Sequence, residues 1–458
     1  MQKENKLGSM PIKKLIWDMS LPIIASMLVQ ALYNIVDSMF VSRVSQDALT
    51  AVSLAFPAQT LIISFAAGTA VGVNALMGRA LGAKNPERAS AVAVNGVFLA
   101  LVSAIVTAIL GLSLAGVFFR AQTNVVSISS QGQAYLRIVT GCSFAVYGQV
   151  MFERLLQGTG RTKLSMYTQG LGAIINIILD PVFIFTFKLG VAGAAIATII
   201  GQCCGCALAI WFNFKKNKEL TLNFRTFRPN GKIIGNIYAI GLPSIIMMAI
   251  GSVMNFLMNK ILITYHAAHE TAATAFGIYF KLNSFIFMPI NGLNNGIVPI
   301  ISYSYGAQNR RRMMETVKRS VVYAVVMMLV GMCIFELFPG TLLKIFKAEG
   351  ELMAVGIPCL RLTALSFSMA GICIALGTVM QALGKAVFSM INSLVRQLIF
   401  LVPSAYVLAR YGAQVGNSDL VWWCYPIAEI ASLTLTVIFF IRVYRTLIVK
   451  IPMDGPEV

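Results

Sequence analysis

The 458-residue chain is strongly apolar: 57% of its residues are hydrophobic, only 12% are charged, and its mean hydropathy is +0.78. A soluble protein of this length would need far more charge on its surface, so the composition indicates an integral membrane protein. Apolar stretches of roughly 20 to 30 residues predict spanning helices and not the short alternating strands of a transmembrane barrel. The formal net charge of +19 does not predict a nucleic-acid partner, because the cations fall mainly in short loops.

The apolar segments predict twelve helices, each long enough to cross a hydrocarbon core of about 30 Å. Their expected bounds are residues 14–41, 47–78, 91–119, 131–157, 163–186, 190–213, 233–265, 272–304, 313–338, 353–380, 387–409 and 419–446. The first segment follows Lys13 and Lys14 and lacks an obvious small-residue cleavage site, so we interpret it as an anchoring helix.

A polar linker, residues 214–232, lies between the sixth and seventh predicted helices and carries Lys215 and Lys216. It divides the chain into two halves of six helices each. We therefore predict an N-terminal six-helix bundle over residues 1–213 and a C-terminal bundle over residues 233–458.

The cations are distributed unevenly among the loops. Most of the 36 Lys and Arg residues fall in the linker, at the two ends of the chain, or in alternate loops such as residues 79–88 and 310–319. Short cytoplasmic loops carry an excess of Lys and Arg. The sequence therefore predicts a multi-pass membrane protein with both termini and the linker in the cytoplasm.

The two halves resemble each other at a constant offset of about 224 residues. The matching segments are residues 78–85 with 302–309, 135–137 with 359–361, and 157–161 with 381–385. Because each half has an even number of crossings, both copies enter from the same side and are related by an axis along the membrane normal. The expected fold is an all-α polytopic membrane protein, with two pseudo-symmetric six-helix bundles around a central cleft suited to alternating access.

Two acids stand out because they fall inside apolar helices. Nearly all of the 17 acidic residues lie in loops or near predicted helix ends, but Asp37 and Asp180 do not. A carboxylate at bilayer depth costs roughly 2.5 to 3.5 kcal/mol and indicates a functional site. Asn34 and Asn176 precede these acids by three and four residues, on about the same helical face. Such groups can hold Na⁺ or carry a proton, or the acids could merely satisfy backbone donors.

Other residues inside the apolar segments are candidates of lower rank. Pro22 and Pro181 would free backbone carbonyls and bend their helices, so they are hinge candidates. Lys281 is a buried cation candidate that could pair, snorkel or move during transport. Glu336 and Glu429 lie nearer helix ends and could pair with Lys or Arg. Since the second half has no counterpart of the two acids, the coupling site should be asymmetric.

A cysteine cluster in the sixth predicted helix has the composition of a metal site. Cys203, Cys204 and Cys206 are flanked by Gly201 and Gly205. Metal sites use different spacing and surroundings, so we interpret these cysteines as small packing residues.

These residues together resemble the multidrug and toxic compound extrusion (MATE) family over nearly the whole chain. The resemblance is carried by Asp37 fifteen positions after Pro22, by residues 176–181, by Gly82-Ala83 after the second helix and by residues 157–160 after the fourth. Acids confined to the first half are similar to the DinF-like branch.

The resemblance implies an antiporter of the cell (inner) membrane that expels cationic, amphipathic drugs or metabolites in exchange for H⁺ or Na⁺. It places an ion site in the first half, formed by oxygen-bearing side chains: Asp37, Asn176, Asp180 and Thr198. A bound Na⁺ would be held by these four, with Tyr135 as a neighbour and Tyr147 as the alternative for that role. Ion binding would neutralise the acids and weaken their hold on a cationic substrate.

We expect a functional monomer in the lipid bilayer, without a cofactor and without enzymatic activity. The nearest rival is a lipid-linked oligosaccharide or lipid flippase of the same superfamily, which should line its cleft with cations for a pyrophosphate headgroup. A channel or membrane-embedded enzyme is less favoured, because no metal-ligand constellation, nucleophile motif or P-loop is found.

Overall fold

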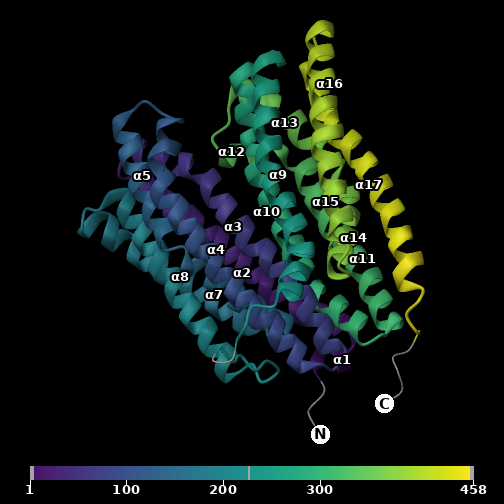
Figure 1. Cartoon of the computed structure of the whole chain (residues 1–458). Coiled ribbons are helices and arrows are strands. Elements are labelled where there is room, and N and C mark those ends of the chain that lie inside the picture. Colours follow the sequence, from purple (N-terminus) through teal and green to yellow (C-terminus); the bar gives the residue numbers. More distant parts are fainter. Residues whose placement is uncertain (1–4, 225–226, 454–458) are drawn as a thin grey trace. The chain divides into compact units, whose positions relative to one another are not determined.

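The computed structural model describes residues 5–224 and 227–453, and this part of the chain is helical with no strand (Figure 1). Residues 225 and 226 of the predicted linker lie outside the description. The chain divides into two compact units: Met1–Ile245 with Ser302–Ala307, and Ile246–Ile301 with Gln308–Val458. The predicted bundles over residues 1–213 and 233–458 stay a prediction.

The helices up to the linker all belong to the first unit. They are α1 (Lys6–Ser9), α2 (Ile12–Ser42), α3 (Gln46–Gly82), α4 (Pro86–Arg120), α5 (Val126–Gly141), α6 (Phe144–Gly158), α7 (Thr162–Pro181), the π-helix η1 (Val182–Thr186) and α8 (Gly190–Lys215).

Two long helices, α9 (Gly231–Tyr265) and α10 (His269–Gly306), contribute residues to both units. The remaining elements belong to the second unit. They are α11 (Arg310–Leu337), α12 (Pro339–Ile345), α13 (Gly350–Ala364), α14 (Phe367–Ala382), α15 (Ala386–Leu394), the π-helix η2 (Val395–Leu401), α16 (Val402–Val415), the 3₁₀-helix η3 (Ser418–Trp423), α17 (Cys424–Val443) and the π-helix η4 (Tyr444–Ile448).

The helices are compatible with twelve membrane crossings, but two of these crossings consist of two helices separated by a short break. Within the described residues, ten helices are long and apolar enough to span a bilayer, and α13 with α14 forms an eleventh span bent by 48°. The pair α5 and α6 occupies the matching place in the first half. The single helices predicted over residues 131–157 and 353–380 are therefore wrong in this detail.

The two breaks share a local cause. Each follows a threonine whose hydroxyl donates to the carbonyl four residues earlier, at 2.7 Å for Thr140 and 2.6 Å for Thr363. Three residues on, Ser143 donates to the carbonyl of Ala104 at 3.0 Å, and Ser366 donates to that of Thr363 at 2.7 Å. Thr140, Thr363 and Ser366 bond carbonyls of their own span and so compete with the backbone hydrogen bonds that would continue it, whereas Ser143 bonds a carbonyl of α4.

The repeat predicted from the sequence reappears in the loop geometry. Lys84 and Gln308 both adopt a φ of 53°, a left-handed conformation that ends the preceding helix. The next residues, Asn85 and Asn309, cap α4 and α11 by accepting a hydrogen bond from the N–H three residues later, at 2.8 and 2.9 Å. The two halves thus use the same turn to connect equivalent helices.

Glycine allows very close packing at the end of α3 in the first unit. A Cβ on Gly82 would lie 2.0 Å from the carbonyl oxygen of Tyr303, and one on Gly306 would lie 2.1 Å from that of Arg79. The contact between α3 and the last turn of α10 is therefore reciprocal, and no other residue fits at either position without a backbone shift. The same principle, small residues allowing helices to approach, shapes the ion site.

Candidate ion site

The site begins with a close contact between α7 and α8, which lie side by side in the first unit (Figure 1). A Cβ on Gly172 would lie 2.9 Å from the carbonyl oxygen of Gly201, and one on Gly201 would lie 2.6 Å from that of Gly172. Asn176 follows Gly172 by one helical turn, and its Cβ is 3.3 Å from the position a Gly201 side chain would take. The glycine pair thus brings polar groups of the two helices within hydrogen-bonding distance.

Asn176 connects the two helices through its amide. Its Nδ2 donates to Asp180 Oδ1 at 3.3 Å and to Thr198 Oγ1 at 3.2 Å. Asp180 is fully buried and Asn176 is 3% exposed. The structure therefore brings together three of the residues that the sequence and the family resemblance indicated.

Three oxygens at this site have no hydrogen-bond partner: Asp180 Oδ2, Asn176 Oδ1 and Asp37 Oδ1. Buried polar atoms are nearly always bonded, so unbonded ones need a physical explanation. Carboxylate and amide oxygens are ligands suited to a hard cation such as Na⁺, and a carboxylate can also take a proton. The donor set fits either ion.

Asp37 of α2 is half-buried and lies within electrostatic reach of Asp180. Two tyrosines interact electrostatically with both acids: Tyr33, one turn before Asp37 on α2, and Tyr135 of α5. The Tyr135 hydroxyl accepts a hydrogen bond from Gln59 Nε2 of α3 at 2.6 Å. Tyr33 and Gln59 were not among the predicted site residues, although the one-turn spacing of Tyr33 from Asp37 was a usable signal.

Two other candidates lie apart from this cluster. Asn34 is exposed, and the structure does not bring its side chain to Asp37 despite their spacing on one helical face. The hydroxyl of Tyr147 pairs with Thr107 Oγ1 at 3.0 Å and not with the acids. The sequence left Tyr135 and Tyr147 open as the neighbour of the ion site, and the structure places Tyr135 beside the carboxylates.

The two prolines differ in their effect on the helix. Pro181 ends α7 directly after Asp180, and the chain continues as the π-helix η1. Because proline has no N–H, the regular hydrogen-bond ladder cannot continue through it, and π-helical turns often occur at functional sites. Pro22 is buried inside α2, which passes through it as one 31-residue helix.

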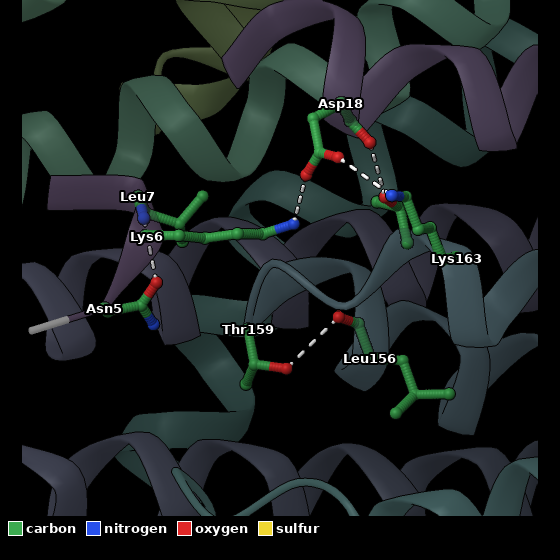
Figure 2. A network of polar contacts seen from close by, with 8 residues as sticks. Asn5, Lys6, Leu7, Asp18, Leu156, Thr159 and Lys163 are labelled. Atoms are coloured by element: carbon green, nitrogen blue, oxygen red, sulfur yellow. Dashed lines mark hydrogen bonds and ion pairs between the residues drawn. The ribbon is translucent and has the colours of Figure 1, made fainter. Parts of the chain in front are cut away.

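Polar contacts fix the segment just before Pro22 (Figure 2). Asp18 lies four residues before Pro22 and pairs with Lys6 of α1 at 2.6 Å and with Lys163 of α7 at 3.4 Å. A cavity of about 640 Å³, lined in part by Trp17, Lys163 and Pro22, opens beside them. The start of α2 is thereby tied to the start of α7, the helix that carries Asp180.

Lys281 is exposed on α10, so the expectation of a buried cation was wrong. A lysine on a spanning helix can lie at the surface because its flexible stem lets the ammonium reach a polar environment.

The remaining acids considered within apolar segments are paired with arginines in the second unit. Glu429 Oε2 accepts from Arg396 Nη1 at 3.0 Å, and Glu336 Oε2 lies 4.0 Å from Arg361 Nε. Pairing with a cation was one of the two interpretations given for each glutamate. Asp37 and Asp180, by contrast, have no cationic partner in the described residues.

One buried acid was missed. Glu153 of α6 is 4% exposed, although its sequence position near the end of a predicted helix suggested a wetter environment. The signal was the polar series Gln149, Glu153 and Gln157, whose spacing of four residues places them on one face of the helix.

The cysteines do not form a metal centre. Cys203, Cys204 and Cys206 are free, and residues 5–224 and 227–453 contain no group of three or more His, Cys, Asp or Glu that could hold a metal. Gly205 instead faces the amide of Gln149, since a Cβ there would lie 2.8 Å from its Nε2. The contact at Gly205 is between α8 and α6, and the role of the three cysteines as small packing residues stays a prediction.

Multiple apolar spans, a repeated helical pattern and under-bonded carboxylates within two of the spanning helices are typical of a multi-pass membrane transporter. A family model makes the assignment specific, because the model described as MatE matches the chain twice, over residues 22–182 and 243–407. The chain belongs to the MatE family, whose members are transporters and not enzymes. The double match also confirms the internal repeat.

Similar proteins cover almost the full chain. The multidrug export protein MepA of Staphylococcus haemolyticus (strain JCSC1435) is 26% identical over 434 residues, 94% of each chain. MepA of Staphylococcus aureus (strain MSSA476) is 24% identical over 417 residues, 90% of each chain.

Solved structures agree with this assignment. A structure described as the outward-facing conformation of a multidrug resistance MATE family transporter of the MOP superfamily has a TM-score of 0.91 and 25% identity, covering 98% of this chain and 99% of that one. A MOP superfamily transporter from Pyrococcus furiosus gives the same values. The predicted MATE resemblance is confirmed, and the DinF-like branch stays a prediction.

Proposed function

We propose that this protein is a secondary active antiporter that exports small cationic, amphipathic drugs or metabolites in exchange for H⁺ or Na⁺ by alternating access. The observation that carries the proposal is Asp180: fully buried in a spanning helix, bonded to an amide and free of any cation in the described residues. Relatives of similar length are named multidrug export proteins, which supports the substrate class.

The proposed ion site consists of Asp37, Asn176, Asp180 and Thr198, with Tyr135 beside it. The half-buried Asp37 is the more accessible acid, so we assign it the first contact with an entering ion. Asp180 is the deeper site. A Na⁺ would use the unbonded oxygens of Asp37, Asn176 and Asp180, whereas a proton would neutralise one carboxylate directly.

Coupling follows from charge. The empty site carries negative charge that favours a cationic substrate, and ion binding from outside removes part of that charge and releases the substrate. Transport then results from the different affinities of the two states. A membrane potential supplies about 2.3 kcal/mol per charge per 100 mV, so a single coupled ion is a useful driving force.

Pro22 and Pro181 are the proposed hinges, because each lacks the N–H that would complete the backbone hydrogen bonds of a helix that carries one of the two acids. Similar structures have been described in a straight and in a bent conformation, which supports conformational freedom in this fold. We also propose that the two predicted bundles move as units in a monomer of the cell (inner) membrane, with both termini in the cytoplasm.

A lipid or oligosaccharide flippase is the weaker candidate. Its anionic headgroup would meet Asp37 and Asp180, and like charges at low dielectric repel. The described part of the first unit offers no cationic partner beside Asp37 and Asp180 that could bind such a headgroup.

The test is efflux of a fluorescent cation from proteoliposomes with an imposed H⁺ or Na⁺ gradient. Asp37→Asn and Asp180→Asn should each abolish gradient-driven efflux while the protein still inserts. The matched control is Glu315→Gln, which removes an exposed carboxylate of α11 that is 43% accessible. Wild-type rates in both aspartate variants would disprove the site.

A further inference from the structure

The buried acid Glu153 lies outside the ion site and has no role in the proposal above. Its carboxylate accepts three hydrogen bonds, all from neutral groups. Gln149 Nε2 and Thr168 Oγ1 donate to Oε1 at 3.0 and 2.9 Å, and Gln169 Nε2 donates to Oε2 at 2.6 Å. A charge buried at this depth is normally paired with a cation, so the neutral shell needs an explanation.

The charged and titratable groups around Glu153 do not neutralise it. Arg154 on the same helix acts on it electrostatically, but its Nη1 donates to Gln157 Oε1 at 3.0 Å and forms no ion pair with the acid. Cys206 of α8 is a neutral thiol within electrostatic reach. Helix α7 contributes the neutral amide and hydroxyl named above, and α3 packs apolar groups such as Met77 against α6.

The shell can serve the protonated acid as well as the charged one. Thr168 Oγ1 lies 2.9 Å from Glu153 and 2.7 Å from the carbonyl of Ser165, so its single hydrogen can point to either oxygen. Gln169 Oε1 is buried without a partner, and a half-turn of this amide would present it to the acid. Thr168 and Gln169 therefore each have an arrangement in which they accept a hydrogen bond from a protonated Glu153.

Proton uptake can be written without further rearrangement. A proton from water forms an O–H bond at one Glu153 oxygen, and this O–H donates to Thr168 Oγ1 or to the turned Gln169 Oε1. The Thr168 hydrogen then bonds the Ser165 carbonyl. On release the proton returns to water, and the carboxylate again accepts all three hydrogen bonds. In the arrangement that uses Thr168, no hydrogen bond of the shell is lost in either state.

The position along α7 connects this acid to the ion site. Asp180 follows Gln169 by eleven residues, a rise of roughly 16 Å along the same helix. In the other direction, polar contacts continue to the end of α6, where Gln157 Nε2 donates to Ser165 Oγ at 2.8 Å. Glu153 thus lies between the deep carboxylate and the loop that joins α6 to α7.

From this geometry we propose that Glu153 is a second proton-binding site of the first unit, which takes up and releases its proton through the α6–α7 end of the unit. The inference rests on the proposed ion-coupled function for its role in transport. The protonation of Glu153 itself can be tested independently of transport.

The direct test uses wild-type protein in lipid nanodiscs. A hydrophobic carbodiimide, which reacts with protonated carboxyl groups, should modify Glu153 in a pH-dependent manner, as quantified by peptide mass spectrometry. Infrared difference spectra between acidic and alkaline pH should contain a protonated-carboxyl band that is lost in Glu153→Gln and kept in Glu315→Gln. Absence of labelling at Glu153 together with an unchanged band in Glu153→Gln would overturn the proposal.

The transport test separates a proton site from a structural one. Glu153→Gln preserves the size of the side chain and mimics the hydrogen bonding of the protonated acid, so a structural role predicts wild-type pH dependence of efflux. A proton site predicts that this dependence is lost in Glu153→Gln and restored in Glu153→Asp. If wild-type efflux needs no ion gradient, the proposed coupling fails, while labelling and infrared spectra still decide the state of Glu153.

Discussion

Replacing Asp180 by asparagine should separate stability from transport. The wild-type carboxylate is fully buried, with one oxygen accepting a single 3.3 Å hydrogen bond and the other without a partner. An under-bonded buried polar group costs about 1–3 kcal/mol, and asparagine has the same shape without the charge. Asp180→Asn should therefore gain about 1–3 kcal/mol in the free energy of unfolding at neutral pH while it loses ion-coupled efflux.

The assay is thermal unfolding of purified protein in detergent, measured beside efflux from proteoliposomes. A gain of 1 kcal/mol corresponds to about 2–4 °C in Tm for a unit of 150–250 residues, so the expected rise is several degrees. The difference should shrink at acidic pH, because a protonated acid has no charge to bury. Glu315→Gln, an exposed control, should stay within about 0.5 kcal/mol of wild type.

Two results would refute this reasoning. A lower Tm in Asp180→Asn would show that the carboxylate stabilises the fold, as an acid that only satisfies backbone donors would do. Retained gradient-driven efflux at wild-type rate would show that the acid does not bind the coupling ion. If Asp180→Asn lost efflux and also had a lower Tm, misfolding would explain the loss of efflux. The result would then give no support for ion coupling at Asp180.

Three further predictions concern other parts of the chain. Arg396→Met removes the half-buried cation beside the buried Glu429 carboxylate and should cost about 3 kcal/mol in denaturant unfolding, most of which Arg396→Met/Glu429→Leu should recover. An additive double variant would contradict the pairing. Gly82→Ala places a Cβ 2.0 Å from a carbonyl oxygen of α10 and should cost about 1–3 kcal/mol in the free energy of unfolding. Gly170→Ala is the control, because a Cβ there meets nothing within 4 Å and should not destabilise the protein. Equal Tm values for the two variants would contradict this packing. Burial raises the pKa of Glu219 in the linker, so the stability of the wild-type protein should fall as the pH rises through that folded-state pKa. Glu219→Gln should flatten this fall in stability. An unchanged pH profile of stability in the variant would contradict the prediction.

Local sequence was a good guide where the chemistry is local. The four-residue spacing of Asn176 and Asp180 on one helical face led directly to their hydrogen bond. The repeated Gly-Ala-x-Asn turns gave matching caps at Asn85 and Asn309, because an N-cap needs only its own side chain and the next turn. Predictions of this type depend on residues within one or two turns of each other.

Features that depend on several helices were harder to predict. Glu153 and Glu336 have similar positions near predicted helix ends, yet one is 4% exposed under a neutral shell and the other is near an arginine. Asn34 has the spacing to face Asp37, but the packing of α2 leaves it exposed. Periodicity defines a face of a helix and not the environment that covers it.

The sequence by itself determined that this chain crosses a membrane many times in two related halves and that two acids lie among apolar residues, since length, hydropathy and spacing are properties of the chain. Only the tertiary structure decided which acids remain without a cation: Glu429 meets Arg396 from 33 residues away, whereas Asp180 accepts from the amide of Asn176 and has no cationic partner within residues 5–224 and 227–453. The reason is physical, because the charge state and bonding of a buried carboxylate depend on the groups that packing brings within a few ångströms of it.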